Sequence, residues 1–111
     1  MQYVFDGELY KIIKITGPQH NMLALGFGES LAAIEVKDLK KSKDNVINIF
    51  PLQVRNQVLR GLNEINEELG TNYKVVKIQF VSSDSPSETI YVELSKEIVK
   101  RLNAGEKFTR I

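Results

Sequence analysis

The sequence has no cysteine and only one histidine, His20, in 111 residues. Without a thiol the chain forms no disulfide framework, and it offers neither thiolate chemistry nor a cysteine-based metal site. Because histidine alone has a free pKa near neutrality, acid–base catalysis would need His20 or a carboxyl group with a strongly shifted pKa. We therefore expect a protein that works by binding, with no cofactor and no catalytic residue.

Long apolar runs are also missing. No segment reaches the roughly 20 apolar residues that a transmembrane helix needs. The first residues, Met1–Asp6, lack the basic region and the apolar stretch of about 7–15 residues that form a secretory signal. We expect a soluble protein that stays in the cytoplasm, and a membrane is not an expected partner.

Neither sign of charge dominates, since 15 basic and 14 acidic residues leave a net charge of +1. Such a chain has no strong overall field to attract a polyanion. Its lysines gather only in Lys37–Lys43, where Asp38 and Asp44 interrupt them and no aromatic residue is interleaved to stack on a base. The charge pattern argues against nucleic acid as a partner.

The length and composition describe an ordinary folded domain. At 111 residues, with 42% hydrophobic and 26% charged residues, the chain is long enough for one core and too short for two typical domains. No internal repeat or linker divides it. We expect a single domain over residues 1–111.

The first part of the chain has the composition of strands. Gln2–Phe5 and Glu8–Thr16 are rich in aromatic and branched residues, and Asp6-Gly7 between them favours a hairpin with a two-residue turn. After Gly17-Pro18, Asn21–Phe27 predicts a third strand with one large apolar face and one face of smaller residues. The large face consists of Leu23, Leu25 and Phe27, and the other of Met22, Ala24 and Gly26.

The segment before residue 51 is ambiguous. Ser30–Leu39 fits a helix capped by Ser30 or a strand, and the alternation of its apolar residues leads us to favour the strand. Lys37–Asn45 reads as a mixed polar connection. Val46–Phe50 suits another short extended piece.

The clearest predicted element is a helix over Pro51–Leu69. Its apolar residues recur every three or four positions, which places them on one helical face: Val54, Val58, Leu62, Ile65 and Leu69. Pro51 suits the first helical position, where a missing N–H costs nothing. Gly70 suits a left-handed residue that closes the helix.

The last part of the chain predicts a strand, a loop, a strand and a helix. The first strand carries Val76, Ile78 and Phe80 inward, and the loop is 82–87, which is rich in serine. Alternating apolar residues predict a second strand over Thr89–Leu94, with Ile90, Val92 and Leu94 inward. Ser95 would then cap a helix that ends near Gly105, and Phe108 and Ile111 would fold back on the core.

These elements predict an α+β fold: an antiparallel sheet of four to six strands with two helices packed on one face. The other face of the sheet would then be partly open to solvent or to a partner. An open sheet face is the physical reason to expect a binding function.

Motifs that would support chemistry are absent or incomplete. His20 reads as a solvated loop histidine between strands. Asp84 with Ser83, Ser85 and Glu88 lacks the alternation of a calcium loop, so we expect a polar turn and no metal site. Gly26 and Gly28 lack the third glycine of a dinucleotide fingerprint, and a tight turn or a bulge is their expected use.

The candidate partner-binding residues lie around the outer face of the predicted strand Thr89–Leu94. A tyrosine flanked by polar residues on a strand face is typical of an interface anchor, and a plain surface tyrosine is the alternative. The candidate set consists of Asp84, Glu88, Thr89, Tyr91 and Glu93.

In size, expected solubility, lack of catalytic residues and α+β layout, the whole chain resembles the small cytoplasmic immunity proteins with which bacteria neutralise a cognate toxin. These include the immunity proteins of contact-dependent growth inhibition systems. The resemblance is one of general character without a diagnostic motif, so it transfers no residue role. It implies a toxin domain as the partner. Immunity proteins against nucleases are often acidic, whereas this chain is nearly neutral, and a local acidic face would draw on Glu64, Glu67, Glu68, Asp84, Glu88 and Glu93.

Two other functions fit the sequence. Sheet edges or the open face could join copies of the chain into a homo-oligomer. A small enzyme could use His20 and carboxylates, and a deep pocket that holds His20 beside a carboxylate would support it.

Overall fold

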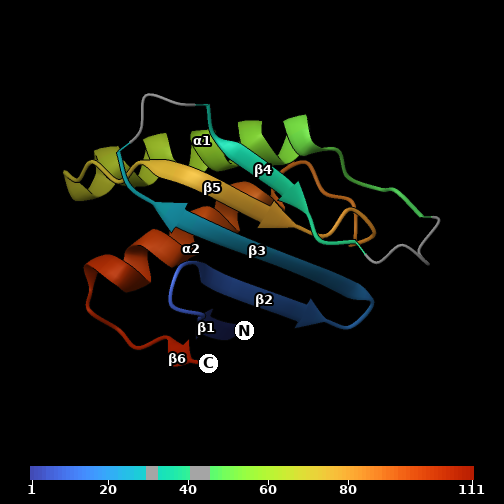
Figure 1. The fold of residues 1–111 in the computed structure, drawn as a ribbon, viewed down its shortest axis with the longest axis horizontal. Coiled ribbons are helices and arrows are strands. Elements are labelled where there is room, and N and C mark those ends of the chain that lie inside the picture. The colour runs from blue at the N-terminus through green and yellow to red at the C-terminus, as the bar shows by residue number, and fades with distance from the viewer. Residues whose placement is uncertain (30–32, 41–45) are drawn as a thin grey trace.

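The computed structural model describes residues 1–29, 33–40 and 46–111. One six-stranded sheet forms the front layer in Figure 1, and both helices pack behind it. The two chain ends lie close together beside the outer strands (Figure 1). In chain order the elements are β1 (Gln2–Phe5), β2 (Tyr10–Thr16), β3 (Gln19–Phe27), β4 (Glu35–Asp38), α1 (Pro51–Leu69), β5 (Val75–Phe80), α2 (Ile90–Asn103) and β6 (Thr109–Arg110).

The sheet is mixed, with the strand order β4-β5-β3-β2-β1-β6. The α+β class, the strand number and the placement of both helices on one face are confirmed (Figure 1). The prediction of a purely antiparallel sheet is wrong, because the outer pairs β4–β5 and β1–β6 run parallel. The helix α1 connects β4 to β5, and a helical crossover returns the chain to the same end of the sheet, which makes the joined strands parallel.

Two hairpins build the middle of the sheet. Phe5 pairs with Tyr10, so the first turn has four residues instead of the expected two, and the Asp6 carboxylate accepts the N–H groups of Glu8 and Leu9. This loop folds Leu9 over Gly26, where an added Cβ would lie 2.7 Å from Leu9 Cδ2. A tight turn or a bulge was expected at these glycines, and the β3–β5 register shifts between Gly26 and Phe27, which agrees with the bulge.

The helix α1 has the predicted bounds. Pro51 stands at its first position, and the side-chain oxygen of Gln53 accepts the N–H of Phe50 at 2.9 Å. Gly70 ends the helix with φ 66°, as expected for a left-handed residue. Its buried face consists of Val54, Val58, Gly61, Leu62 and Ile65.

The predicted strand Thr89–Leu94 and the predicted helix cap at Ser95 are wrong. A single helix, α2, covers this segment, because Tyr91, Leu94 and Ile98 form one buried stripe at helical spacing. The hydroxyl of Ser87 accepts the N–H groups of Thr89 and Ile90. Gln57 of α1 adds a cap across the helix pair, since its side-chain oxygen accepts the N–H of Tyr91 at 3.0 Å.

The remaining segments follow the prediction in part. β4 confirms a strand within Ser30–Leu39, although residues 30–32 lie outside the described part of the chain. Of the predicted connection Lys37–Asn45, the first residues belong to the end of β4, and residues 41–45 lie outside the described part of the chain. Val46–Phe50 forms no strand. Phe108 packs edge-on against Tyr3 as expected, whereas Ile111 remains 75% exposed.

Candidate functional site

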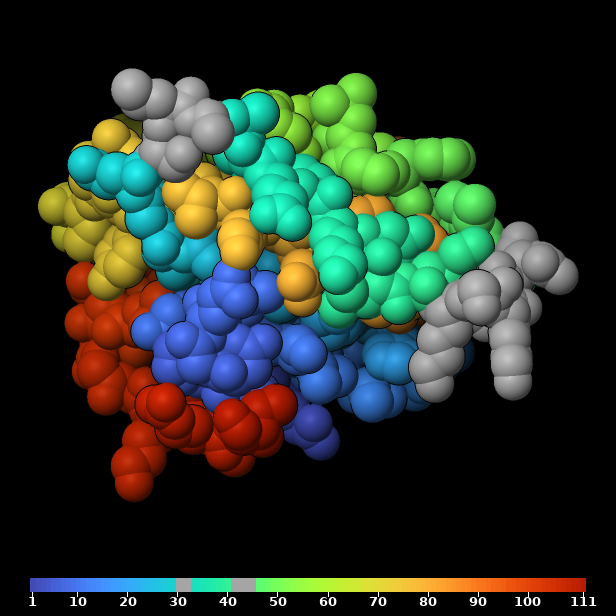
Figure 2. Space-filling model, viewed as in Figure 1, coloured from blue at the N-terminus to red at the C-terminus, as the bar shows by residue number. Residues whose placement is uncertain are grey.

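The side of the sheet that faces away from the helices is the candidate site, and we call it the open face. Leu23 and Leu25 of β3 belong to the core beneath the helices, so the alternate residues Met22 and Ala24 project to the opposite side. In Figure 2 the first three strands and β4 reach this surface with no helix over them. Pairing across the sheet also places on this side Lys11, Ile13, Ile15, His20, Glu35, Lys37, Lys77 and Gln79.

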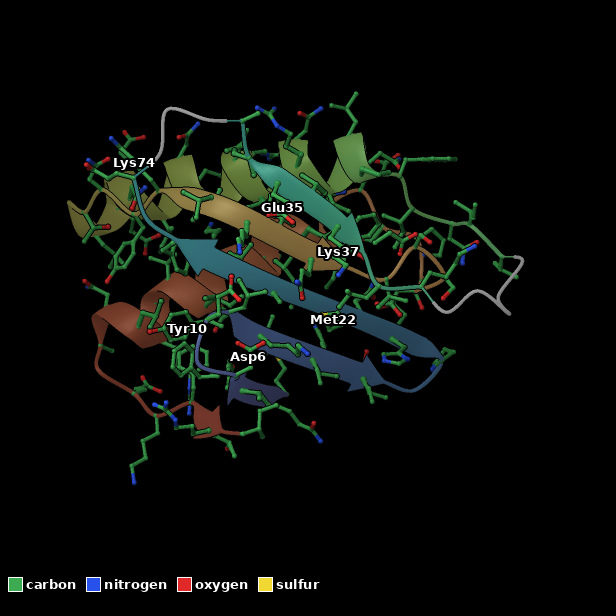
Figure 3. The ribbon with its side chains drawn as sticks, in the orientation of Figure 1. Asp6, Tyr10, Met22, Glu35, Lys37 and Lys74 are labelled. Carbon is green, nitrogen blue, oxygen red and sulfur yellow. The ribbon has the colours of Figure 1, made fainter. Side chains whose placement is uncertain are left out.

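One end of the open face is charged. Lys77 of β5 forms an ion pair with Glu8 from the first hairpin loop. Glu35 and Lys37 of β4 lie beside this pair, and Figure 3 labels both on the strand at the sheet edge. Together with Ile78 and Gln79 these side chains line a polar hollow of about 230 Å³.

The other end of the open face is mainly apolar. A hollow of about 520 Å³ there is lined by Ile13, His20, Met22, Leu39, Val81, Ser83 and Asp84. We call it the apolar hollow. Figure 3 labels Met22 on β3 near the middle of the sheet. The polar groups of the hollow are His20 from the start of β3 and two residues of the loop that follows β5.

The loop after β5 places Asp84 by taking the position of a strand beside β3. β5 ends at Phe80, yet the N–H of Met22 donates to Asp84 Oδ2 at 2.9 Å. At the next residue of the loop, the N–H of Ser85 donates to the carbonyl of His20, and the N–H of His20 donates to the Ser85 hydroxyl, each at 3.0 Å. The loop therefore satisfies the edge of β3 that β5 no longer reaches.

Asp84 is a buried carboxylate, with 6% of its surface exposed. Burial raises the pKa of Asp84 above its usual 3.8, and the hydrogen bond from Met22 and the nearby imidazole of His20 oppose this rise only in part. Burial likewise raises the pKa of Tyr91 to about 12, against the hydrogen bond from Asn21. Both groups lie at the same end of the sheet.

This raised pKa predicts how stability depends on pH. A folded state that holds its proton more tightly than the unfolded state loses stability as the pH rises from 3.8 through the folded pKa. We expect the free energy of unfolding of the parent, measured by urea denaturation, to decrease relative to that of Asp84→Asn as the pH rises from about 4 to neutrality. Both proteins would carry His20→Gln, which removes the imidazole near Asp84 from the comparison. A difference in the free energy of unfolding between the two proteins that does not change with pH would contradict the prediction.

His20 lies within β3 and not in the turn before it, and it is exposed on the open face. Among the described residues no group of three metal-ligating side chains comes together, which includes the loop around Asp84. Gly26 sits beneath Leu9 and Gly28 donates its N–H to the carbonyl of Lys74, so both glycines have structural roles.

The predicted partner-binding residues do not share one face. Tyr91 is fully buried between the helices and the sheet and is therefore not a surface anchor. Glu88, Thr89 and Glu93 are exposed around the start of α2, on the helix side of the sheet. Asp84 alone lines the apolar hollow of the open face.

The sequence analysis placed Met22 and Ala24 on this side of β3 but missed the other apolar residues of the open face. Ile12 and Ile13 are adjacent in β2 and project to opposite sides of the sheet, so one isoleucine of the pair had to lie outside the main core. That signal was present in the sequence. Leu39 and Val81 gave no such signal, because they lie outside the strands.

Comparisons with protein families, with curated proteins and with solved structures find no match to this chain. Neither of the helices in the described residues combines the length and the apolar character that a bilayer crossing requires.

Proposed function

We propose that this chain is a non-catalytic protein-binding domain whose open face contacts the partner. The observation that carries the proposal is the apolar hollow on a sheet face that neither α1 nor α2 covers. Protein interfaces typically combine an apolar centre with a polar rim. The open face offers both, with the hollow at one end and the charged residues of β4 and β5 at the other.

The partner class that fits the general character of the chain is a toxin domain, which would make the chain an immunity protein. A neutralising domain acts by covering another protein's surface and needs no reactive group of its own. Charges of both signs on the open face, such as Glu35 and Lys37, suit a partner with a mixed surface. A local acidic face receives less support, because Glu64 already contacts Arg60 and Lys96.

Site-specific photocrosslinking in the native host tests the proposed face. A photoreactive phenylalanine derivative would replace Ile15 or Lys37, which are exposed on the open face, or Glu67, which is exposed on α1. We expect a covalent adduct with another protein from the first two positions and none from Glu67. Adducts between two copies of the chain would instead support the oligomer, and adducts only from Glu67 would contradict the proposed face.

The captured protein then tests the immunity function. Production of a toxin alone should stop growth of a bacterial host, and co-production of this chain should restore it. Ile15→Glu should weaken the protection by placing a charge on the apolar end of the open face, whereas Glu67→Gln should not. If the captured protein is harmless to the host, the chain is a protein-binding domain but not an immunity protein.

A small acid–base enzyme is the second candidate, because His20 and Asp84 line the same hollow. Neither group has the setting of a catalytic residue, since His20 is exposed and one oxygen of Asp84 already accepts the N–H of Met22. Catalytic groups are usually held in sites that exclude water. Turnover of a small compound that disappears in His20→Gln would favour the enzyme over the binding domain.

A further inference from the structure

We propose that the apolar hollow receives an arginine side chain of the partner protein, with its guanidinium group on Asp84. The inference rests on the proposed function and names the chemistry that the open face recognises. The aliphatic part of the arginine would lie against Ile13, Met22 and Val81. The partner would thus present one basic side chain within an otherwise apolar patch.

The Asp84 carboxylate lies in the hollow without a charged partner from the described residues. It is nine-tenths buried and lines the hollow, and its one hydrogen bond from the described residues comes from Met22 to Oδ2. No ion pair from the described residues reaches it, not even from His20 nearby. Burial removes part of the solvation of this carboxylate, but its second oxygen keeps access to solvent, since no enclosed side-chain oxygen of the described residues lacks a hydrogen bond. A cation from a partner would replace the solvation that burial removes from the carboxylate.

Other carboxylates of the chain are better satisfied. The Asp38 carboxylate accepts the hydroxyl and the N–H of Ser82 and the N–H of Lys40. Burial acts to raise the pKa of Asp38, but these hydrogen bonds prevail and hold it below 3.8. Glu8 and Glu106 have basic partners. Asp84 differs in being buried, facing a hollow and having no charged partner among the described residues.

The wall of the hollow also suits a long basic side chain. Four of its seven lining residues, Ile13, Met22, Leu39 and Val81, are apolar. A long basic side chain buries its aliphatic stem on such a surface and extends its charged end to a polar group. Arginine fits this arrangement better than lysine, because its planar group donates two parallel hydrogen bonds to a carboxylate and is more weakly hydrated.

Two described lysines of the open face, Lys11 and Lys37, do not fill this role, and Lys77 pairs with Glu8. Lys11 lies opposite Ala24 in the sheet, and Lys37 lies opposite Gln79, so both are nearer the charged end. Neither forms an ion pair with Asp84. Their positive charge at that end disfavours a strongly basic partner surface and favours a single basic residue.

An NMR titration tests the inference without knowledge of the partner. The probe is arginine capped at both ends, and capped citrulline, which has nearly the same shape without the charge, is the matched control ligand. We expect capped arginine to bind about fivefold more tightly than capped citrulline, because charge-assisted hydrogen bonds are the stronger ones. The largest shifts should occur at the Met22 amide and the Ile13 methyl groups.

Asp84→Asn should remove this preference, since the amide keeps an oxygen for the N–H of Met22 but loses the charge. Glu35→Gln, at the charged end of the open face, should leave it unchanged. Equal affinity of the two ligands for the parent, or shifts centred on Glu35, would overturn the inference. A partner crosslinked through the open face without any arginine preference would overturn this inference alone, whereas arginine preference without such a partner would count against the proposed function.

Discussion

Replacement of Gly61 by leucine is expected to prevent folding, and replacement by alanine is expected to lower the free energy of unfolding by about 2 kcal/mol. Gly61 lies where α1 crosses α2. A Cβ atom there would lie 2.0 Å from Ser95 Oγ and 2.6 Å from the carbonyl oxygen of Val92. The second contact is with backbone, so the helices themselves would have to separate. The higher helix propensity of alanine, worth roughly 1 kcal/mol, does not offset this cost.

Urea denaturation of matched variants checks this prediction. Glu67→Ala, on the exposed side of the same helix, should change the free energy of unfolding by less than about 0.5 kcal/mol. Ser95→Ala in the Gly61→Ala background should recover part of the loss, because it removes the hydroxyl but leaves the carbonyl of Val92 in place. An unchanged or higher stability of Gly61→Ala would show that the helices do not cross at this residue.

The local part of the fold was predictable from the sequence. The stripe of α1, its proline and its closing glycine agree on one helix, and the bounds Pro51–Leu69 are confirmed. The first hairpin and the third strand were also predictable, although the first turn is longer than expected, because short turns join neighbouring strands. In these segments the residues that decide the structure are close together in the sequence.

The error at α2 has a physical reason. Ile90, Val92 and Leu94 alternate as in a strand, but the same residues with Tyr91 and Ile98 also fit a helix, and packing against α1 decides between the two. Gln57 caps the start of α2 from 34 residues away, a contact that no local pattern reveals. The parallel pairs at both edges of the sheet were also missed, although the helix α1 that joins β4 to β5 was predicted.

The candidate site was less predictable than the fold. An open sheet face was expected, and Asp84 was among the candidate residues, but its place beside β3 depends on a hydrogen bond to Met22 across 62 residues. The apolar hollow also combines β2, β3 and two loops. A surface built from such distant segments appears only once the register of the sheet is known.

Tyr91→Ala is expected to lower the free energy of unfolding by about 3–5 kcal/mol, the usual cost of removing a large aromatic side chain from a core. Tyr91 is fully buried and packs within the core cluster. Tyr91→Phe keeps the ring and removes the hydroxyl, which accepts a hydrogen bond from Asn21 Nδ2 at 3.4 Å. Its cost should be about 1 kcal/mol, since the bond is long and the amide of Asn21 also donates to the carbonyl of Ser85.

The contrast with Glu93→Ala makes this prediction decisive for the local structure. On a strand over Thr89–Leu94, residues 91 and 93 would share one face, and both substitutions would have similar, small effects on unfolding. On α2, residue 91 faces the core and Glu93 faces solvent, so Glu93→Ala should change the free energy of unfolding by less than about 0.5 kcal/mol. Urea denaturation of the three variants would distinguish the two structures. A Tyr91→Ala variant that keeps its stability but no longer binds the partner would show that Tyr91 lies on the protein surface. Removing the ring of a core residue would instead lower the stability.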